Sequence, residues 1–355
     1  MKRTVAVALS GGLDSSVAAA LLKGEDYRVI GLHFQTGYES STDNLASSVS
    51  NAGTSQARQV AKEIGIEFES IDCSKAFQQK VVNYFIDTYA SGQTPSPCVV
   101  CNPSIKFGPV LKKARQLGAS ALATGHYARI KRGPDGRFRL LKGIDSSKDQ
   151  SYFLSRLTQE HLSQAIFPLG NYTKKEARNI AKVSGLTSFT RKESQELCFV
   201  SSSNYKEFLS EHGKLSLNPG PIVNAKDEVL GQHQGLYAYT IGQRRGIGIP
   251  GAEPYYVVGL DITGNRLIIG TKSESESREC TVTNINWIGT ESPEKPISAQ
   301  TRIRYRHREA ESIITPLDHY TAKVTFSKAQ QAITPGQAAV FYQEERVLGG
   351  GWIVL

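Results

Sequence analysis

The first 125 residues alternate short apolar runs with amphipathic stretches. The runs that predict buried strands are residues 4–9, 28–34, 67–72 and 121–124. The stretches with helical periodicity are residues 15–22, 56–64, 77–89 and 107–117, and a Ser-rich loop is expected at 39–56. This alternation predicts an α/β fold with a doubly wound parallel sheet. Ligands of such sheets bind beyond the carboxyl ends of strands, so we expect a site near Leu9, Phe34 and Thr124.

A different pattern begins near residue 215, where Gly and Pro interrupt short runs rich in Val, Ile and Tyr. This texture predicts an all-β C-terminal third. The expected strands are residues 255–260, 266–269, 301–307, 322–326 and 338–342, the last three in a small barrel. We therefore expect an α/β domain at residues 1–202, a small central β-rich domain at 203–272 and a C-terminal β-barrel at 273–355.

Charge adds one feature to this pattern. The 355-residue chain has 42 Lys and Arg against 33 Asp and Glu, a formal net charge of +9. Residues 125–214 hold 16 basic and 9 acidic side chains. Within this stretch, the run 129–142 contains six basic residues and one acidic residue, Asp135. Such a cluster favours a polyanionic partner, and a solvated basic loop is the alternative.

The lengths of the apolar runs and the number of cysteines indicate the cellular compartment and the state of the thiols. No apolar run reaches the about 18 residues of a membrane span, and residues 5–9 are too short for a signal-peptide core. We expect a cytoplasmic protein with no membrane partner. The five cysteines, an odd and sparse set, favour reduced or reactive thiols over a disulfide framework.

The string Ser-Gly-Gly-Leu-Asp-Ser-Ser at residues 10–16 separates a strand from a helix. Glycine amides and a helix N-terminus in this arrangement bind phosphate, and the serines add hydroxyl donors. Asp14 would orient the loop or hold Mg²⁺ on the phosphates. An ordinary turn with a serine cap is the alternative. The loop lacks the lysine of a P-loop and resembles the PP-loop of ATP pyrophosphatases, which activate an oxygen by adenylation.

Cys98 and Cys101 lie three residues apart in a proline-rich segment before a helix. A structural zinc site needs four ligands, and this single pair supplies two, so we predict no metal site. A nucleophilic or redox role is favoured, because a helix N-terminus lowers a thiol pKa. For Cys198, in Glu-Leu-Cys-Phe, a buried inert thiol is the alternative to a reactive one.

Three further polar groupings are candidates for binding. They are the loop 125–128, the cluster 148–151 and the alternating arginines at 302, 304, 306 and 308. In a strand the four guanidinium groups would share one face and suit phosphate oxygens. Ordinary loops and a solvated strand face are the alternatives.

Taken together, these strings resemble the tRNA-specific 2-thiouridylases, which replace the 2-oxygen of the wobble uridine by sulfur. The match runs the length of the chain and includes SGGLDSS at 10–16, TPSPCVVCN at 94–102, IKFG at 105–108, ATGHYARI at 123–130, KDQSYFL at 148–154, ELCF at 196–199, YTIGQRRGIGIPG at 239–251, RIRYRH at 302–307 and PGQ at 335–337. The resemblance implies a PP-loop catalytic domain of the adenine nucleotide alpha hydrolase type, followed by a tRNA-binding central domain.

The resemblance also implies site residues. ATP, with Mg²⁺, would be held by Ala8, Leu9, Ser10, Gly11, Gly12, Leu13, Asp14, Ser15, Phe34 and Gly125. Cys198 would carry a persulfide received from a sulfur-donor protein, and Cys101 would attack it, freeing sulfide and leaving a Cys101–Cys198 disulfide. The residues expected at the tRNA and its flipped base are Ser96, Pro97, Cys98, His126, Lys148, Asp149, Gln150, Arg304, Tyr305 and Gln337.

The chain departs from the family pattern at several positions. Some relatives have an acid, proposed as a proton acceptor, where this chain has Cys98, so the base is unassigned. Met commonly stands at the position of Phe34 and Asn at that of Ser96. Two other functions compete: a PP-loop enzyme that adenylates a small molecule, and a tRNA-binding protein without catalysis.

Overall fold

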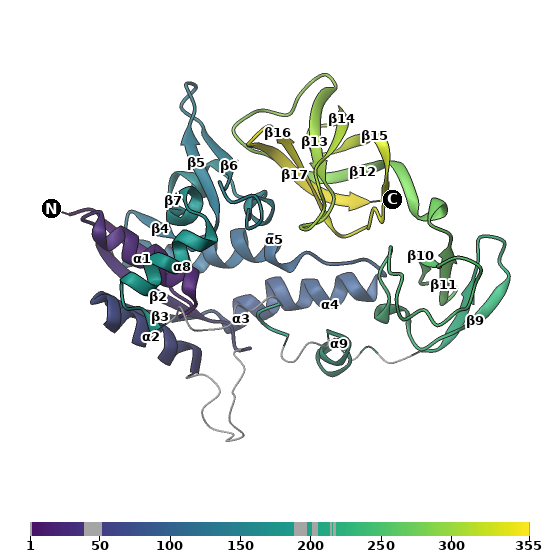
Figure 1. Ribbon diagram of the computed structural model, residues 1–355, viewed down its shortest axis with the longest axis horizontal. Helices are drawn as coiled ribbons and strands as arrows, with labels where there is room; N and C mark the ends of the chain where they lie inside the picture. Colours follow the sequence, from purple (N-terminus) through teal and green to yellow (C-terminus); the bar gives the residue numbers. More distant parts are fainter. Residues whose placement is uncertain are drawn as a thin grey trace.

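The computed structural model describes residues 2–38, 52–187, 197–200, 205–213, 215 and 218–354. Its N-terminal part is built on a parallel sheet in the order β3-β2-β1-β4-β7 (Figure 1). The strands are β1 (Thr4–Ala8), β2 (Arg28–Gln35), β3 (Glu67–Asp72), β4 (Ala121–Ala123) and β7 (Ala165–Ile166). Because β1 pairs with β2 on one side and with β4 on the other, the order reverses there. The predicted doubly wound sheet is confirmed, with its switch point between β1 and β4.

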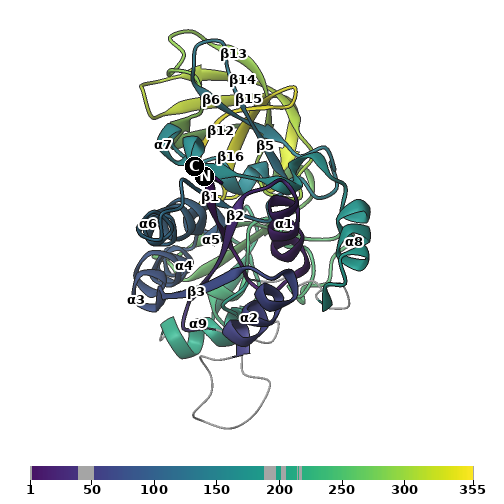
Figure 2. The same ribbon diagram turned by 90° about the vertical axis from the view of Figure 1, so that its left-hand side faces the viewer.

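Helices cover both faces of this sheet because the side chains of β1 alternate between two cores. Val5 and Val7 pack in one core with α1 (Leu13–Gly24), α2 (Ala52–Ile64) and α8 (Lys174–Val183). Ala6 and Ala8 pack in the other core. The helical segments on that face are α3 (Ser74–Phe77), η1 (Gln78–Val82), α4 (Asn83–Ala90), α5 (Pro97–Cys101), η2 (Asn102–Val110) and α6 (Leu111–Gln116). Figure 2 shows α1 and α8 on one side of the sheet and α4 and α6 on the other.

All four helices predicted in this part begin earlier than expected, and the one predicted from residue 15 starts at Leu13. Helix α2 starts at Ala52, inside the stretch predicted as a loop, whose residues 39–51 lie outside the described part. The helix predicted from residue 77 starts at Ser74. The one predicted from residue 107 is preceded by helical structure from Pro97 onwards, with a break at Gly108 (φ −98°, ψ −112°). Proline lacks an N–H to donate, so Pro109 fits directly after this break.

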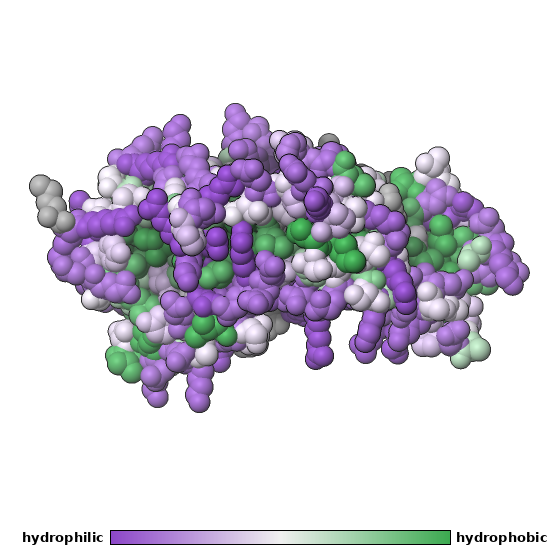
Figure 3. Space-filling model, turned by 90° about the horizontal axis from the view of Figure 1, so that it is seen from above, coloured by the Kyte–Doolittle hydropathy of each residue, from purple (hydrophilic) through white to green (hydrophobic). Residues whose placement is uncertain are grey.

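The basic run 129–142 is a β-hairpin and not a loop. It consists of β5 (Ala128–Arg132) and β6 (Phe138–Lys142), and β6 pairs with the last strand of the chain at Leu141 and Arg346. The hairpin therefore joins the N-terminal part to the C-terminal barrel. Seen from above, hydrophilic side chains dominate this face of the molecule, with smaller hydrophobic patches between them (Figure 3).

The C-terminal part is a closed barrel of six strands, as predicted. In chain order they are β12 (Glu276–Trp287), β13 (Ile297–Arg302), β14 (Ala310–Pro316), β15 (Ala322–Gln331), β16 (Ala338–Gln343) and β17 (Arg346–Val354), and pairing of β12 with β17 closes the ring. The predicted strand 301–307 is wrong, because β13 ends at Arg302 and a turn follows. The expected ladder of four arginines on one strand face does not exist.

The central part is β-rich, as predicted, and its sheet has fewer strands than the barrel. Its sheet has the order β10-β11-β8-β9, from β8 (Gly220–Val223), β9 (Val229–His233), β10 (Tyr256–Asp261) and β11 (Arg266–Gly270). The remaining short helices are η3 (Ser151–Leu154), α7 (Gln159–Ser163), η4 (Pro168–Asn171), α9 (Tyr205–Gly213), η6 (Leu236–Ala238) and η7 (Ser273–Ser275). In the described part of the chain, no helix is long and apolar enough to span a membrane.

Candidate active site

Two loops meet at the switch point of the N-terminal sheet, one after β1 and one after β4. A Cβ on Gly125 would lie 2.7 Å from the carbonyl carbon of Asp14 and 2.8 Å from the Ser15 nitrogen. Only glycine permits this approach of the two backbones. Gly11 has φ +77°, and a Cβ there would lie 2.9 Å from Gln56 Cβ. The glycines of both loops are therefore required by contacts within the protein.

Hydroxyl groups fix the loop that leads into α1. The Ser15 hydroxyl lies 3.1 Å from Ser10 Oγ and donates to the Gly12 carbonyl at 3.0 Å. The Ser16 hydroxyl donates to the same carbonyl at 2.8 Å. Among the described residues, no side chain caps the N-terminus of α1 at Gly12, so the alternative of a serine cap is wrong. An uncapped helix N-terminus beside a glycine loop fits a phosphate group.

Asp14 is engaged by two side chains: Tyr127, from the loop 125–128 that the sequence indicated, and Lys174, which the sequence did not single out. The Asp14 Oδ1 accepts from the Tyr127 hydroxyl at 2.9 Å and from Lys174 Nζ at 2.7 Å. The Lys174 side chain is 10% exposed and lies at the start of α8. These contacts orient the loop, which is one of the two roles expected of Asp14. Phe34 lies near the end of β2, at the same sheet edge, and is half-buried.

The thiol pair lies in α5, on the face of the sheet covered by α4 and α6. Cys98 is exposed, and Cys101 is 9% exposed, with Ser96 and Pro97 buried before them. Burial raises the pKa of Cys101 to about 12, against an opposing effect of Lys106; ionised Cys198, Cys98 and Cys73 would raise it further. The Cys98 side chain reaches solvent, yet the protein atoms packed around it desolvate the thiol enough to raise its pKa as well, against an opposing effect of Lys106. The lowered pKa expected from a helix N-terminus is wrong, because Cys101 ends this short helix and desolvation dominates.

Cys198 is exposed, which excludes the alternative of a buried inert thiol. Its neighbour Phe199 anchors it: the ring packs against Phe77, Phe85 and Phe208 with centroid distances of 5.7, 5.2 and 5.4 Å. Phe199 and Cys101 belong to the same apolar core. The structure thus brings Cys198 and Cys101 into one region, although 97 positions separate them in the sequence.

His126 connects the thiol helix to the nucleotide loop. Its Nε2 lies 3.3 Å from Lys106 Nζ, and its Nδ1 lies 2.7 Å from Thr124 Oγ1. Burial and the charge of Lys106 hold the pKa of this imidazole well below its usual 6.5. The imidazole is 8% exposed, so His126 faces the protein interior and its expected tRNA contact stays a prediction.

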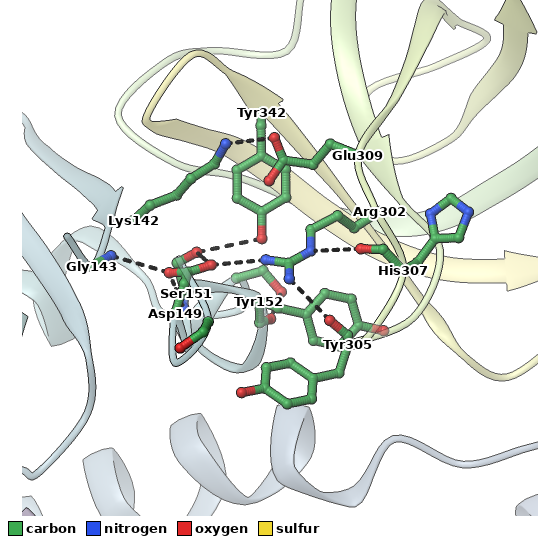
Figure 4. A network of polar contacts seen from close by, with 12 residues as sticks. Lys142, Gly143, Asp149, Ser151, Tyr152, Arg302, Tyr305, His307, Glu309 and Tyr342 are labelled. Atoms are coloured by element: carbon green, nitrogen blue, oxygen red, sulfur yellow. Dashed lines mark hydrogen bonds and ion pairs between the residues drawn. The ribbon is translucent and has the colours of Figure 1, made fainter. Parts of the chain in front are cut away.

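Asp149 is buried in a network between the N-terminal part and the barrel (Figure 4). Its carboxylate accepts from Arg302 at 2.8 Å, from the Gly143 and Ser151 amides at 3.1 Å each, and from the Ser151 hydroxyl at 3.0 Å. Gln150 accepts from the Tyr127 amide at 3.1 Å. The structure therefore gives Asp149 and Gln150 a role in holding loops together, and their contact with tRNA stays a prediction. Lys148 is half-exposed beside them.

The turn 303–309 brings the barrel towards the thiol helix. Arg302 donates to the carbonyls of Tyr305 and His307, at 3.0 and 3.3 Å (Figure 4). The Tyr305 ring lies 4.3 Å from that of Phe153, between centroids. The pKa of Tyr305 is raised chiefly by burial. The Phe153 carbonyl accepts from the side-chain amide of Asn102, directly after the thiol helix, at 3.0 Å. Arg304 donates to the carbonyls of residues 331 and 332.

Gln337 fastens the proline-rich segment before α5. Its amide donates to the carbonyls of Thr94 and Pro95, at 3.2 and 2.9 Å. A Cβ on Gly336 would lie 2.8 Å from the same Thr94 carbonyl. The PGQ string therefore docks the barrel on the thiol segment. The sequence showed this string but no sign of its partner.

Comparison with known proteins identifies the class to which this fold and site belong. Family models match along the whole chain: a tRNA methyl transferase HUP domain at residues 3–202, a tRNA methyl transferase PRC-barrel domain at 206–271 and an aminomethyltransferase β-barrel domain at 277–353. A HUP domain is a nucleotide-binding α/β domain, in agreement with the loop at the switch point.

The curated relatives define the family more narrowly. A "tRNA-specific 2-thiouridylase MnmA" of Geotalea uraniireducens is 45% identical over 99% of this chain and 95% of its own length. The protein of the same name from Geobacter metallireducens is 45% identical over 99% of this chain and 97% of its own length. The one from Halothermothrix orenii is 44% identical over 98% of this chain and 98% of its own length. The chain belongs to the tRNA-specific 2-thiouridylase family.

Proposed function

We propose that the protein replaces the 2-oxygen of the wobble uridine of tRNA by sulfur, with consumption of ATP. One observation supports this proposal: the glycine loop at the N-terminus of α1 and the helix that bears Cys101 are connected through Gly125, His126 and Lys106. Gly125 packs on the loop 10–16, and His126 is the next residue of the chain. Lys106 contacts His126 and belongs to the helical segment that follows Cys101. An adenylating enzyme for small molecules would not need the thiols.

The loop residues 8–15, with Phe34 and Gly125, would bind ATP. When bound, ATP supplies the phosphoryl electrophile: the uridine O2 attacks its α-phosphorus, pyrophosphate leaves, and C2 becomes electrophilic. The α1 N-terminus offers amides to the phosphates. Mg²⁺ would be bound mainly by the phosphates of ATP. The Asp14 carboxylate already accepts hydrogen bonds from Tyr127 and Lys174, so it is less able to act as a metal ligand.

The two thiols would then deliver sulfur. Exposed Cys198 is placed to receive a persulfide from a donor protein, and buried Cys101 is placed away from solvent. The Cys101 thiolate attacks the inner sulfur of the persulfide, forms the Cys101–Cys198 disulfide and releases hydrosulfide. Hydrosulfide adds to C2, AMP leaves with the former O2, and a cellular thiol reduces the disulfide.

The residues near the thiols would receive the tRNA. Ser96, Pro97 and Cys98 would surround the extruded uridine, and the Tyr305 ring, which packs on Phe153, would offer a surface for stacking. Lys148, Arg304 and the basic hairpin would meet phosphates. His126, Asp149, Gln150 and Gln337 would act through the loops that they hold.

Incubation with ATP, a persulfide source and tRNA that has an unmodified wobble uridine tests the proposal. We expect 2-thiouridine in the digested tRNA and AMP in equal amount. AMP formed without tRNA would indicate adenylation of a small molecule, and no AMP would indicate an RNA-binding protein. Because the matching domain models carry the words methyl transferase, a reaction with S-adenosylmethionine is the control, and we expect no methyluridine.

A further inference from the structure

The attacking thiol poses an electrostatic problem. Cys101 is 9% exposed, and burial raises its pKa to about 12. A thiolate, not a thiol, is the nucleophile in disulfide chemistry. The Cys101 thiolate therefore needs a neighbouring group that favours its charged form.

We propose that Lys106 is this group: its ammonium, held in place by His126 and Thr124, stabilises the Cys101 thiolate and the hydrosulfide that the thiolate displaces. This inference rests on the proposed sulfur transfer. It gives a function to the IKFG string, which the nucleotide and thiol sites leave without one.

The helix after Cys101 is wide enough to bring Lys106 back over it. Lys106 follows Cys101 by five positions, within the π-helical segment η2. In an α-helix, five residues correspond to a rotation about 140° past one turn. A π-helix joins residues i and i+5, so the fifth residue lies about one turn above the first. Wide turns of this kind are frequent at functional sites.

The ammonium of Lys106 is held by a buried pair of side chains. Nζ donates to His126 Nε2 at 3.3 Å, which requires that nitrogen to be the acceptor. The ring proton then lies on Nδ1 and is donated to Thr124 Oγ1 at 2.7 Å. His126 is 8% exposed and Thr124 is 2% exposed. Since the pKa of His126 lies well below 6.5, the imidazole remains neutral.

The charges that surround the thiols show what Lys106 does. It lowers the pKa of both Cys98 and Cys101, whereas ionised Cys198, Cys98 and Cys73 act on Cys101 in the opposite sense. Attack on the persulfide moves negative charge from the Cys101 sulfur to the departing outer sulfur. A fixed cation near Cys101 would stabilise the thiolate at the start of this transfer and the hydrosulfide released beside it.

The test measures the Cys101 thiolate directly. The rate of iodoacetamide labelling of Cys101 is followed from pH 6 to 10 by fragment mass spectrometry, which separates it from Cys98, in the wild type and in Lys106→Met. We expect about tenfold less labelling of Lys106→Met at pH 8, equivalent to a rise of about one pKa unit. Lys106→Arg should retain most of the wild-type profile. Exposed Lys112→Met is the matched control and should match the wild type.

Single-turnover formation of 2-thiouridine, measured over the same pH range, separates the inference from the function. We expect its rise with pH to shift upward in Lys106→Met in parallel with labelling. Unchanged labelling and unchanged pH profiles in a folded Lys106→Met, with wild-type thiolation intact, would overturn the role of Lys106 alone. A wild-type protein that forms no 2-thiouridine would overturn the proposed function and this inference with it.

Discussion

Arg302 of the barrel and Asp149 of the N-terminal part form an ion pair of 2.8 Å, in which their side chains are 12% and 3% exposed. The same guanidinium holds the turn that bears Tyr305, and the same carboxylate holds the loop before η3. This pair therefore connects the fold of the barrel to the wall of the thiol site.

Loss of one partner of this pair should destabilise the protein strongly. In Arg302→Met the Asp149 carboxylate stays buried without its cation, and we expect a loss of about 3–5 kcal/mol in the free energy of unfolding. Urea denaturation measures it. Arg137→Met removes an exposed pair with Glu291 and should cost less than about 1 kcal/mol. Equal losses in the two variants would contradict the importance of the buried pair.

The cysteines should divide into two classes. Cys101→Ala and Cys198→Ala should each abolish 2-thiouridine formation, because one loses the nucleophile and the other the persulfide carrier. Cys73→Ala and Cys280→Ala should remain active, since neither thiol belongs to the proposed transfer: Cys73 precedes α3, and Cys280 packs in the core of the barrel. Thiolation by Cys198→Ala with a persulfide donor would refute its assignment.

Lys174 should matter for ATP and its neighbour should not. In Lys174→Met the Asp14 carboxylate loses its ion pair beside the phosphate loop, and we expect the KM for ATP to rise by about tenfold, close to 1.4 kcal/mol. Lys175→Met changes an exposed lysine next to it on α8 and should leave KM unaltered. The measurement is tRNA-dependent AMP formation at varied ATP. Equal KM values for all three proteins would rule out this role.

Binding of tRNA should depend on salt through Lys148. If its ammonium contacts a phosphate, Lys148→Ala should flatten the slope of log K against log salt by roughly 0.9. Lys323→Ala, which removes a pair with Glu279 on the barrel, serves as the control. A slope that does not change in Lys148→Ala would show that this lysine is a solvated surface residue and not a phosphate contact.

The turn 303–309 should weaken in acid. Burial, with Arg304 and Arg302 beside it, lowers the pKa of His307 to about 4. Between about pH 6.5 and 4 the unfolded chain therefore binds a proton that the folded one does not, so stability falls as the pH falls through this window. The urea midpoint should fall less in His307→Gln. Identical pH dependence in both proteins would contradict this account.

The sequence predicted those features that depend on local pattern. Apolar periodicity predicted every strand of the parallel sheet except the two-residue β7, and the glycines of the loop 10–16 indicated a phosphate site at the sheet edge. The barrel was visible in its short alternating runs. The extent of β13 was not, because four arginines at alternate positions have the pattern of a strand, whereas Arg302 turns back to hold the chain that follows.

Tertiary structure alone decided how the parts of the site act. Gln337 reaches Thr94 across 243 positions, and Arg302 reaches Asp149 across 153. The pKa of Cys101 also depends on packing between distant segments. Its position near a helix N-terminus suggested a lowered pKa, whereas burial in the surrounding core raises it. Periodicity and motifs are local properties of the chain, but desolvation and ion pairing arise only when distant segments exclude water together.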